Sequence, residues 1–279
     1  MQNSGMNGMM ELVVIDIDGT LIRSDLTIGE RTLDAIAEVK RRGIAITFAT
    51  GRMISAARRY IEQVGVRLPI IALNGALVGK HRDGDAVLHT PIIEEHFAKM
   101  LPMLAQSEAA TTIVQGDVAF GWNIDDFLRE RLSSWIVNIC EISPHDSPPQ
   151  PTIAMVAGKE IPVKNTAEQL RTISIDKEIQ LFLFPSIRYY PMWYLELRAA
   201  GVDKGTGLAA LRNSLGIDKQ DVLVIGDYLN DLPMFEEAGM RTAVSNAHAD
   251  VVAAADYVSP LSCDRDGVGE ILEKMVIAR

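Results

Sequence analysis

Short apolar runs alternate with amphipathic segments along the N-terminal part of the chain. The runs 12–15, 44–49 and 69–73 have the near-continuous apolar character of strands that are buried on both faces. Between the second and third runs, 54–64 has apolar residues at helical spacing and stops at Gly65. This β-α-β-α-β order predicts a parallel sheet covered on both faces by helices that lie in right-handed crossovers.

The first predicted helix has a start signal and a stop signal. Thr27 and Glu30 match a capping box, in which Thr27 is the N-cap and Glu30 reaches back to it. Leu33 and Ile36 follow at helical spacing, and Gly43 is a residue of the type that ends helices. The pattern therefore predicts a helix that starts from Thr27 and ends near Gly43.

The middle of the chain changes to short strands in pairs, with helices between them. Strands are predicted at 86–89, 111–115, 118–122, 153–157 and 180–184. Helices are predicted at 92–106, 125–137 and 163–173, with a proline-rich loop at 143–151. We interpret this part as a smaller α/β cap domain, inserted at 85–196.

The C-terminal part returns to the rhythm of the N-terminal part. It predicts helices at 204–215, 231–238 and 268–278, and strands at 222–225, 242–244 and 256–258. The predicted fold class is therefore α/β: a doubly wound, Rossmann-like parallel-sheet core formed by 9–84 and 197–279, interrupted by the cap domain 85–196. A cleft is expected where the two domains meet.

Composition and charge narrow the range of functions. The chain has 279 residues, and its 48% hydrophobic and 23% charged residues are ordinary for a globular protein. The net charge of −10 argues against nucleic-acid binding, and it requires a local cationic pocket for any anionic substrate. The cysteines, Cys140 and Cys263, are too far apart in sequence to form a metal-ligand pair. With no membrane-length apolar run and no signal peptide, we expect no membrane partner and a cytoplasmic location.

Two carboxylates follow the first predicted strand. Asp16 and Asp18 are two residues apart, so they lie on the same side if the strand continues through them. Two acids on one side repel each other unless a cation lies between them or one holds a proton. The pair therefore indicates a metal site or an acid–base pair, although aspartate before Gly19 is also a common turn signal.

Three further segments place reactive side chains at the ends of core strands or at a helix start. They are Thr50-Gly51-Arg52, Lys204, and the run from Asp227 through Asn230 to Asp231. Each has a structural alternative, since hydroxyls and acids cap helices and most lysines are solvated. Together, in order and at the edge where open α/β sheets bind ligands, they favour one site.

These side chains supply what transfer of a phosphoryl group needs. Asp16 can attack phosphorus and form an aspartyl-phosphate, and Asp18 can protonate the leaving alcohol and then deprotonate the attacking water. Thr50 can hold a phosphate oxygen with its hydroxyl and nearby N–H groups. Lys204 can supply a positive charge to the phosphate and keep Asp16 ionised.

A divalent cation completes the predicted chemistry. Asp16 and Asp227 offer the hard oxygen ligands that Mg²⁺ prefers, together with water and substrate phosphate. Asp231 would orient a metal-bound water or brace Lys204. The predicted cofactor is therefore Mg²⁺.

With these residues assembled, the chain resembles the haloacid dehalogenase-like phosphatases, and within them the Cof-type group. The matching segments are Asp16-Ile17-Asp18-Gly19-Thr20, Ala49-Thr50-Gly51-Arg52, Leu73-Asn74-Gly75-Ala76, Lys204, Gly226-Asp227 to Asp231, and Asp266-Gly267-Val268-Gly269. The resemblance implies metal binding by Asp16, Asp227, Asp231 and the backbone carbonyl of Asp18. It also implies that the phosphate or substrate is bound by Thr50, Gly51, Arg52, Asn74, Lys204 and Asn230.

Two positions depart from the family pattern, and the cap carries its own candidates. Tyr228 and Ser245 stand where the family commonly has a small residue and a glycine, which puts the loop geometry in question. In the cap, Arg188, Tyr190 and Trp193 are candidates for substrate contact, although an ordinary core cluster is the alternative.

The predicted function is hydrolysis of a small phosphorylated metabolite, a sugar phosphate or similar, by a monomer or homodimer. A phosphotransferase or phosphomutase on the same scaffold is the alternative, because the core motifs do not specify the acceptor. A non-catalytic regulator phosphorylated on aspartate fits less well, because it does not need the second acid, Asp18, two residues after the first.

Overall fold

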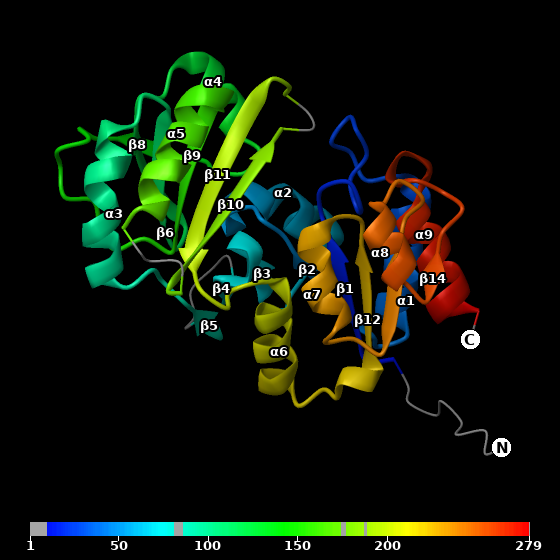
Figure 1. Ribbon diagram of the computed structural model, residues 1–279. Coiled ribbons are helices and arrows are strands. Elements are labelled where there is room, and N and C mark those ends of the chain that lie inside the picture. Colours follow the sequence, from blue (N-terminus) through cyan, green and yellow to red (C-terminus); the bar gives the residue numbers. More distant parts are fainter. Residues whose placement is uncertain (1–9, 81–85, 174–176, 187–188, 279) are drawn as a thin grey trace. The chain divides into compact units, whose positions relative to one another are not determined.

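The computed structural model describes residues 10–80, 86–173, 177–186 and 189–278. Contacts divide the chain into two compact units (Figure 1). The first consists of Met1–Thr50, Arg59–Val87 and Asp203–Arg279, and the second of Gly51–Arg58 and Leu88–Val202. Among the described helices, none has both the length and the apolar character needed to cross a membrane.

Within the first unit, the strands of the main sheet follow the order β14-β13-β12-β1-β2-β3-β4. The strands are β1 (Leu12–Asp16), β2 (Ala45–Ala49), β3 (Ile70–Ala72), β4 (Leu77–Gly79), β12 (Val222–Gly226), β13 (Met240–Ala243) and β14 (Tyr257–Val258). The fully buried β1 pairs in parallel with β2 and β12, while β4 joins β3 antiparallel. The predicted parallel α/β core is thereby confirmed.

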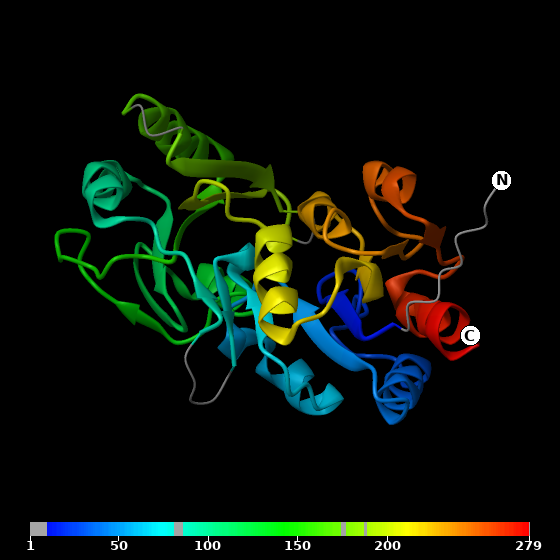
Figure 2. The same cartoon turned by 90° about the horizontal axis from the view of Figure 1, so that it is seen from below.

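Helices cover both faces of this sheet. They are α1 (Glu30–Arg41), α6 (Lys204–Leu215), α7 (Leu232–Phe235), α8 (Ala249–Ala254) and α9 (Gly267–Leu272), which continues as a π-helical turn over Glu273–Ile277. Of α2 (Ile54–Val64), the part from Arg59 onward belongs to this unit. Figure 2 shows α1 and α9 on one side of the sheet, with α7 and α8 on the other. The carboxyl ends of β1, β2 and β12 therefore meet at one edge between two helical layers.

The start of α1 differs from the prediction. Its N-cap is Gly29, which has no capping side chain, and the helix begins at Glu30. The Thr27 hydroxyl and amide instead donate to Asp25 Oδ1, at 2.6 and 2.9 Å. The predicted capping box is wrong because Asp25 occupies both polar groups of Thr27 in a local turn.

The second unit opens with β5 (Leu88–His89) and contains a six-stranded sheet in the order β10-β11-β9-β6-β7-β8. Its strands are β6 (Ala110–Gln115), β7 (Val118–Trp122), β8 (Ile139–Glu141), β9 (Ile153–Lys159), β10 (Ile179–Pro185) and β11 (Met192–Ala199), and its helices are α3 (Glu94–Gln106), α4 (Asp126–Leu132) and α5 (Glu160–Arg171). The central pairs are antiparallel. Three corrections are needed: β8 and β11 were not predicted, and α4 ends at Leu132, short of the predicted 137.

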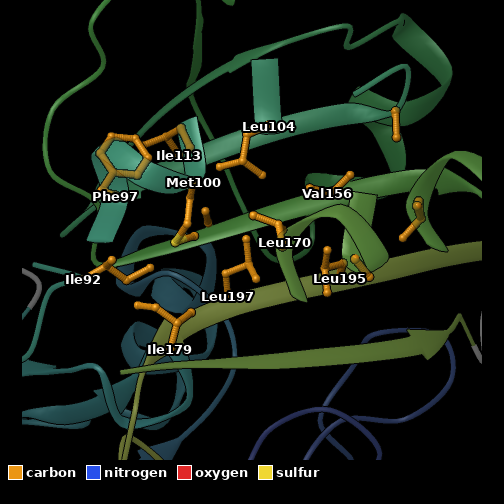
Figure 3. Packing of buried hydrophobic residues seen from close by; sticks show 14 of the residues in the cluster. Ile92, Phe97, Met100, Leu104, Ile113, Val156, Leu170, Ile179, Leu195 and Leu197 are labelled. Atoms are coloured by element: carbon orange, nitrogen blue, oxygen red, sulfur yellow. The ribbon is translucent and has the colours of Figure 1, made fainter. Parts of the chain in front are cut away.

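Helices α3 and α5 cover one face of this second sheet. Met100 and Leu104 of α3 and Leu170 of α5 pack on Val156 and Leu197, which point from the strands toward the helices (Figure 3). All five side chains are fully buried. The second unit therefore has a hydrophobic core of its own.

We expect Gly75→Ala to destabilise the first unit more than Gly43→Ala. Both glycines have left-handed backbones, with φ of 96° and 82°. A Cβ at Gly75 would collide with the carbonyl oxygen of Asp203, whereas nothing lies within 4 Å of a Cβ at Gly43. The Gly43 variant should lose about 1 kcal/mol of unfolding free energy through backbone strain alone, and the Gly75 variant about 3 kcal/mol. Urea unfolding of both variants measures the difference, and equal losses would contradict the close approach of Gly75 to α6.

Candidate active site

The first candidate segment lies where β1 ends. Asp16 is the last residue of β1 and is 4% exposed. The chain then turns tightly, with Leu21 N donating to the carbonyl oxygens of Asp16 and Ile17 at 3.2 and 3.1 Å. Gly19 has φ 81°, and a Cβ there would overlap the carboxylate of Asp227. The turn therefore needs glycine, and it brings the loop after β1 against the loop after β12.

Lys204 reaches the end of β1 from the first residue of α6. Its ammonium donates to Asp16 Oδ1 at 2.5 Å and to Asp231 Oδ1 at 2.6 Å. The start of α6 is held by a capping box between Asp203 and Thr206. Lys204 is fully buried, so this lysine is an internal ion-pair partner and not the solvated lysine of the structural alternative.

Asp231 joins this lysine to the loop after β12. While Oδ1 accepts from Lys204, Oδ2 accepts from the backbone N–H groups of Asp227 and Tyr228, at 2.9 and 3.0 Å. A Cβ at Gly226 would lie 2.7 Å from the Asp231 side chain, so glycine is required where β12 ends. Asp231 therefore shapes the loop that presents Asp227.

Burial and neighbouring charges shift the pKa values of Asp16, Asp227 and Lys204. Burial, against the opposing charge of Lys204, raises the pKa of Asp16 well above its usual value. Burial and the Asp231 carboxylate raise the pKa of Asp227 to about 7. Burial alone would lower the pKa of Lys204, but Asp16 and Asp231 raise it instead. The acids outnumber the base, so the group lacks positive charge.

This charge imbalance fits a divalent cation. Asp16, Asp227 and Asp231 each offer an oxygen within 4.8 Å of the others. Carboxylate oxygens in a buried setting are the ligands that Mg²⁺ takes in proteins, and a cation would offset the burial and the carboxylate repulsion that raise the pKa values of Asp16 and Asp227. These carboxylates can therefore hold a metal ion.

Asn74 and Asn230 are in contact with each other in the first unit, and Asn230 directly precedes Asp231 in the chain. Asn230 Nδ2 donates to Asn74 Oδ1 at 3.0 Å. Asn74 has a left-handed φ of 52°, and its N–H donates to the carbonyl oxygen of Thr50 at 3.0 Å. Thr50 N in turn donates to Ile71 O at 2.7 Å, so backbone bonds join the ends of β2 and β3. The structure thus links three segments that the sequence named separately.

Several of the predicted site residues belong to the second unit, and one lies outside the residues that the structure describes. Gly51 and Arg52 belong to the second unit, and their predicted substrate contact stays a prediction. In the second unit, Tyr190 is 81% exposed, and Trp193 lies under the Lys164 ammonium, 4.3 Å from its ring centre. Arg188 lies outside the described residues.

Two polar side chains at the site had no role in the sequence prediction. The Thr20 hydroxyl donates to Asp227 Oδ1 at 2.6 Å. Asn246 Nδ2 donates to the carbonyl oxygen of Gly19 at 2.8 Å. Thr20 could have been found from its place in the run that starts at Asp16, but no local pattern indicates the contact that Asn246 makes across the fold.

Known proteins resemble this chain over nearly its whole length. The family model of haloacid dehalogenase-like hydrolases matches residues 13–272. The putative phosphatase YxeH of Bacillus subtilis (strain 168) is 26% identical over 276 residues, which are 97% of this chain and 100% of that protein. The 5-amino-6-(5-phospho-D-ribitylamino)uracil phosphatase YitU of the same organism is 26% identical over 271 residues, 94% of this chain and 96% of that protein. The crystal structure of TM0651 from Thermotoga maritima is 27% identical, with a TM-score of 0.79 over 95% of this chain and 97% of that chain.

Proposed function

The chain belongs to the haloacid dehalogenase-like hydrolases, and from this membership we propose that it is a Mg²⁺-dependent phosphatase of a small phosphorylated metabolite. The reaction runs through an aspartyl-phosphate on Asp16. The observation that carries this proposal is the buried Lys204 ammonium between Asp16 and Asp231, with Asp227 beside them. A carboxylate that lies against an ammonium inside a protein is suited to attack on phosphorus.

The relatives support the reaction class more than the substrate. YxeH and YitU are both named phosphatases, and the named substrate of YitU carries its phosphate on a ribityl chain. A sugar phosphate or similar ester is therefore the substrate class we propose. At 26% identity, the individual substrate of a relative does not transfer to this chain.

Asp16 and Asp18 divide the chemistry between them. A carboxylate oxygen of Asp16 forms a bond to phosphorus as the bond from phosphorus to the leaving oxygen breaks, and Asp18 gives that oxygen its proton. Asp18 then takes a proton from water, whose oxygen attacks phosphorus and releases Asp16 and phosphate. Asp18 lies in the loop immediately after β1, two residues beyond the proposed nucleophile.

The phosphate needs neutralising contacts during transfer. Lys204 supplies the charge, since its ammonium already lies against Asp16. Thr50 and the Asn74–Asn230 pair are the neighbouring polar groups that we assign to the phosphate oxygens or the substrate. Because the net charge of the chain is −10, an anionic ester needs local positive charge at the site, which the Lys204 ammonium would supply together with the metal ion that the carboxylates can hold.

The residues at the site fit a magnesium ion. Asp16, Asp227 and the carbonyl oxygen of Asp18 would hold it, and when bound it would neutralise charge on the transferring phosphate. We assign to Asp231 the role of holding Lys204 and the loop after β12 in place, because its oxygens already accept bonds from Lys204 and from the N–H groups of Asp227 and Tyr228. Thr20 orients the Asp227 carboxylate through its 2.6 Å hydrogen bond.

Removal of divalent metal should abolish phosphate release. We expect a chelator to lower turnover of p-nitrophenyl phosphate and of a phosphometabolite panel by at least about 100-fold, because metal charge stabilisation is worth several kcal/mol. Added Mg²⁺ should restore turnover and raise the melting temperature of the wild type. In Asp227→Asn the melting temperature should respond less to Mg²⁺. Full activity in excess chelator would refute the metal requirement, and no turnover of any ester with Mg²⁺ would refute the phosphatase.

A further inference from the structure

The side chain of Asn246 joins two backbone groups that are far apart in sequence. It lies in the loop between β13 and α8, where Nδ2 donates to the carbonyl oxygen of Gly19 and Oδ1 accepts from the N–H of Cys263, both at 2.8 Å. A carbonyl only accepts and an N–H only donates, so just one orientation of the amide makes both bonds. The contact pattern therefore assigns the amide orientation without ambiguity.

The Gly19 carbonyl needs a partner from outside its own turn. Inside the turn, Leu21 N serves the carbonyl oxygens of Asp16 and Ile17. The carbonyl oxygen of Gly19 instead accepts from Asn246. Glycine restrains its own backbone least of all residues, so a turn built on it depends on such outside bonds to keep one conformation.

The loop that carries Asn246 also holds the second acidic segment. Its residue His248 donates its backbone N–H to the carbonyl oxygen of Asp227 at 2.8 Å. Asp227 is itself tied to the first segment by the Thr20 hydroxyl. One loop therefore contacts both segments that the proposed reaction uses, and Asn246 makes its side-chain contact with the first.

We propose that Asn246 is a positioning residue that acts through Gly19. By fixing the Gly19 carbonyl it holds the peptide between Gly19 and Thr20, one residue beyond Asp18, and it thereby restricts the turn that carries the Asp18 carboxyl to the leaving oxygen. This inference rests on the proposed phosphatase function and deepens it, because it assigns a role in proton delivery to a residue that does not touch the substrate.

Because Asn246 is exposed, a role in positioning Asp18 can be distinguished from a role in folding. The residue is exposed, so water replaces its hydrogen bonds in a variant and the net loss of stability is small. We expect the melting temperature of Asn246→Ala to stay within about 4 °C of the wild type. Water cannot replace the effect of Asn246 on the alignment of Asp18, because a water molecule does not hold the Gly19 carbonyl in one orientation.

The test compares esters that differ in their need for an acid. p-Nitrophenolate is a stable anion and leaves without a proton, whereas the alkoxide of an alkyl phosphate must be protonated. For Asn246→Ala we expect kcat/KM for the best alkyl phosphate of the panel to fall by about 10- to 100-fold, and for p-nitrophenyl phosphate by less than about 3-fold. An equal fall for both esters would indicate a structural role only and would overturn the inference.

Two further variants separate the effects of the two hydrogen bonds of Asn246 and control for an added negative charge. Asn246→Asp keeps the acceptor for Cys263 N but turns a second acceptor toward the carbonyl of Gly19, so it should show the same selective loss. Ser245→Asp adds a charge to the neighbouring exposed position and should leave the ratio of the two kcat/KM values unchanged. A wild-type ratio in Asn246→Asp overturns the inference. A wild type that turns over neither ester overturns the phosphatase proposal as well, so the two failures are distinguishable.

Discussion

Asp16→Asn should lower phosphate release by about 10⁴-fold or more, because the nucleophile of the proposed reaction is lost. An amide oxygen is a poor nucleophile, and the amide carries no negative charge to pair with the Lys204 ammonium, 2.5 Å away in the wild type. Asparagine keeps the shape of aspartate, and Lys204 keeps Asp231 as its partner. The measurement is kcat/KM with p-nitrophenyl phosphate and with the best ester of the panel.

A matched substitution separates loss of the nucleophile from loss of an acidic group in general. Asp34 lies exposed on α1, so Asp34→Asn makes the same chemical change away from the site and should keep wild-type activity. Mass spectrometry of the purified Asp16→Asn protein excludes deamidation back to aspartate. Residual activity near the wild-type value, with no deamidated protein present, would contradict the assignment of Asp16 as nucleophile. An acid-stable phosphoryl group found on another residue of the wild-type protein after turnover would contradict the assignment as well.

The arrangement of the site could be predicted because parallel strands end at one edge of a sheet. Asp16 ends β1 and Asp227 follows β12, and these strands are hydrogen-bonded neighbours. Once the apolar runs were interpreted as parallel strands, acids at their carboxyl ends had to lie close together. Lys204 could be included because a helix was predicted to start there, and its two partners, Asp16 and Asp231, were already among the residues that the sequence grouped with it.

What could not be predicted depends on contacts across the fold or on competition within a turn. Asn246 bridges Gly19 and Cys263, and nothing local to residue 246 indicates either partner. Thr27 was predicted as a helix cap, but the choice between capping and bonding to Asp25 depends on where the turn before α1 closes. Such outcomes are decided by small differences in free energy between local alternatives.

Strand β11 was missed for another reason. Its alternation places Leu195 and Leu197 in the core under the helices, while Glu196 and Arg198 are on the opposite face and are also buried. A charged pair buried on a sheet gives the pattern of a half-exposed strand or of a ligand-binding segment. The antiparallel pairing with β9 and β10, which makes this segment a strand, involves residues that are not adjacent in the sequence pattern.

Lys204→Met should destabilise the first unit by about 3–5 kcal/mol at neutral pH, because it leaves buried carboxylates without their counter-ion. Methionine fills a similar volume, but Asp16 and Asp231 each lose an ammonium at hydrogen-bond distance. The Lys204 charge opposes the burial that raises the pKa of Asp16, so its removal raises that pKa further. An acid whose folded pKa exceeds its unfolded value lowers stability as pH rises through that range. The penalty should therefore be largest at high pH and should shrink as pH falls toward about 4.

Urea unfolding of Lys204→Met across this pH range tests the prediction, together with two comparison variants. Lys219→Met makes the same change at an exposed lysine and should alter the free energy of unfolding by less than about 0.5 kcal/mol. Adding Asp231→Asn to Lys204→Met removes one unpaired charge and keeps an acceptor for the N–H groups of Asp227 and Tyr228, so the double variant should be more stable than Lys204→Met alone. If Lys204→Met were as stable as Lys219→Met at neutral pH, the carboxylates would not depend on this ammonium. The electrostatic basis for an ionised Asp16 nucleophile would then be lost.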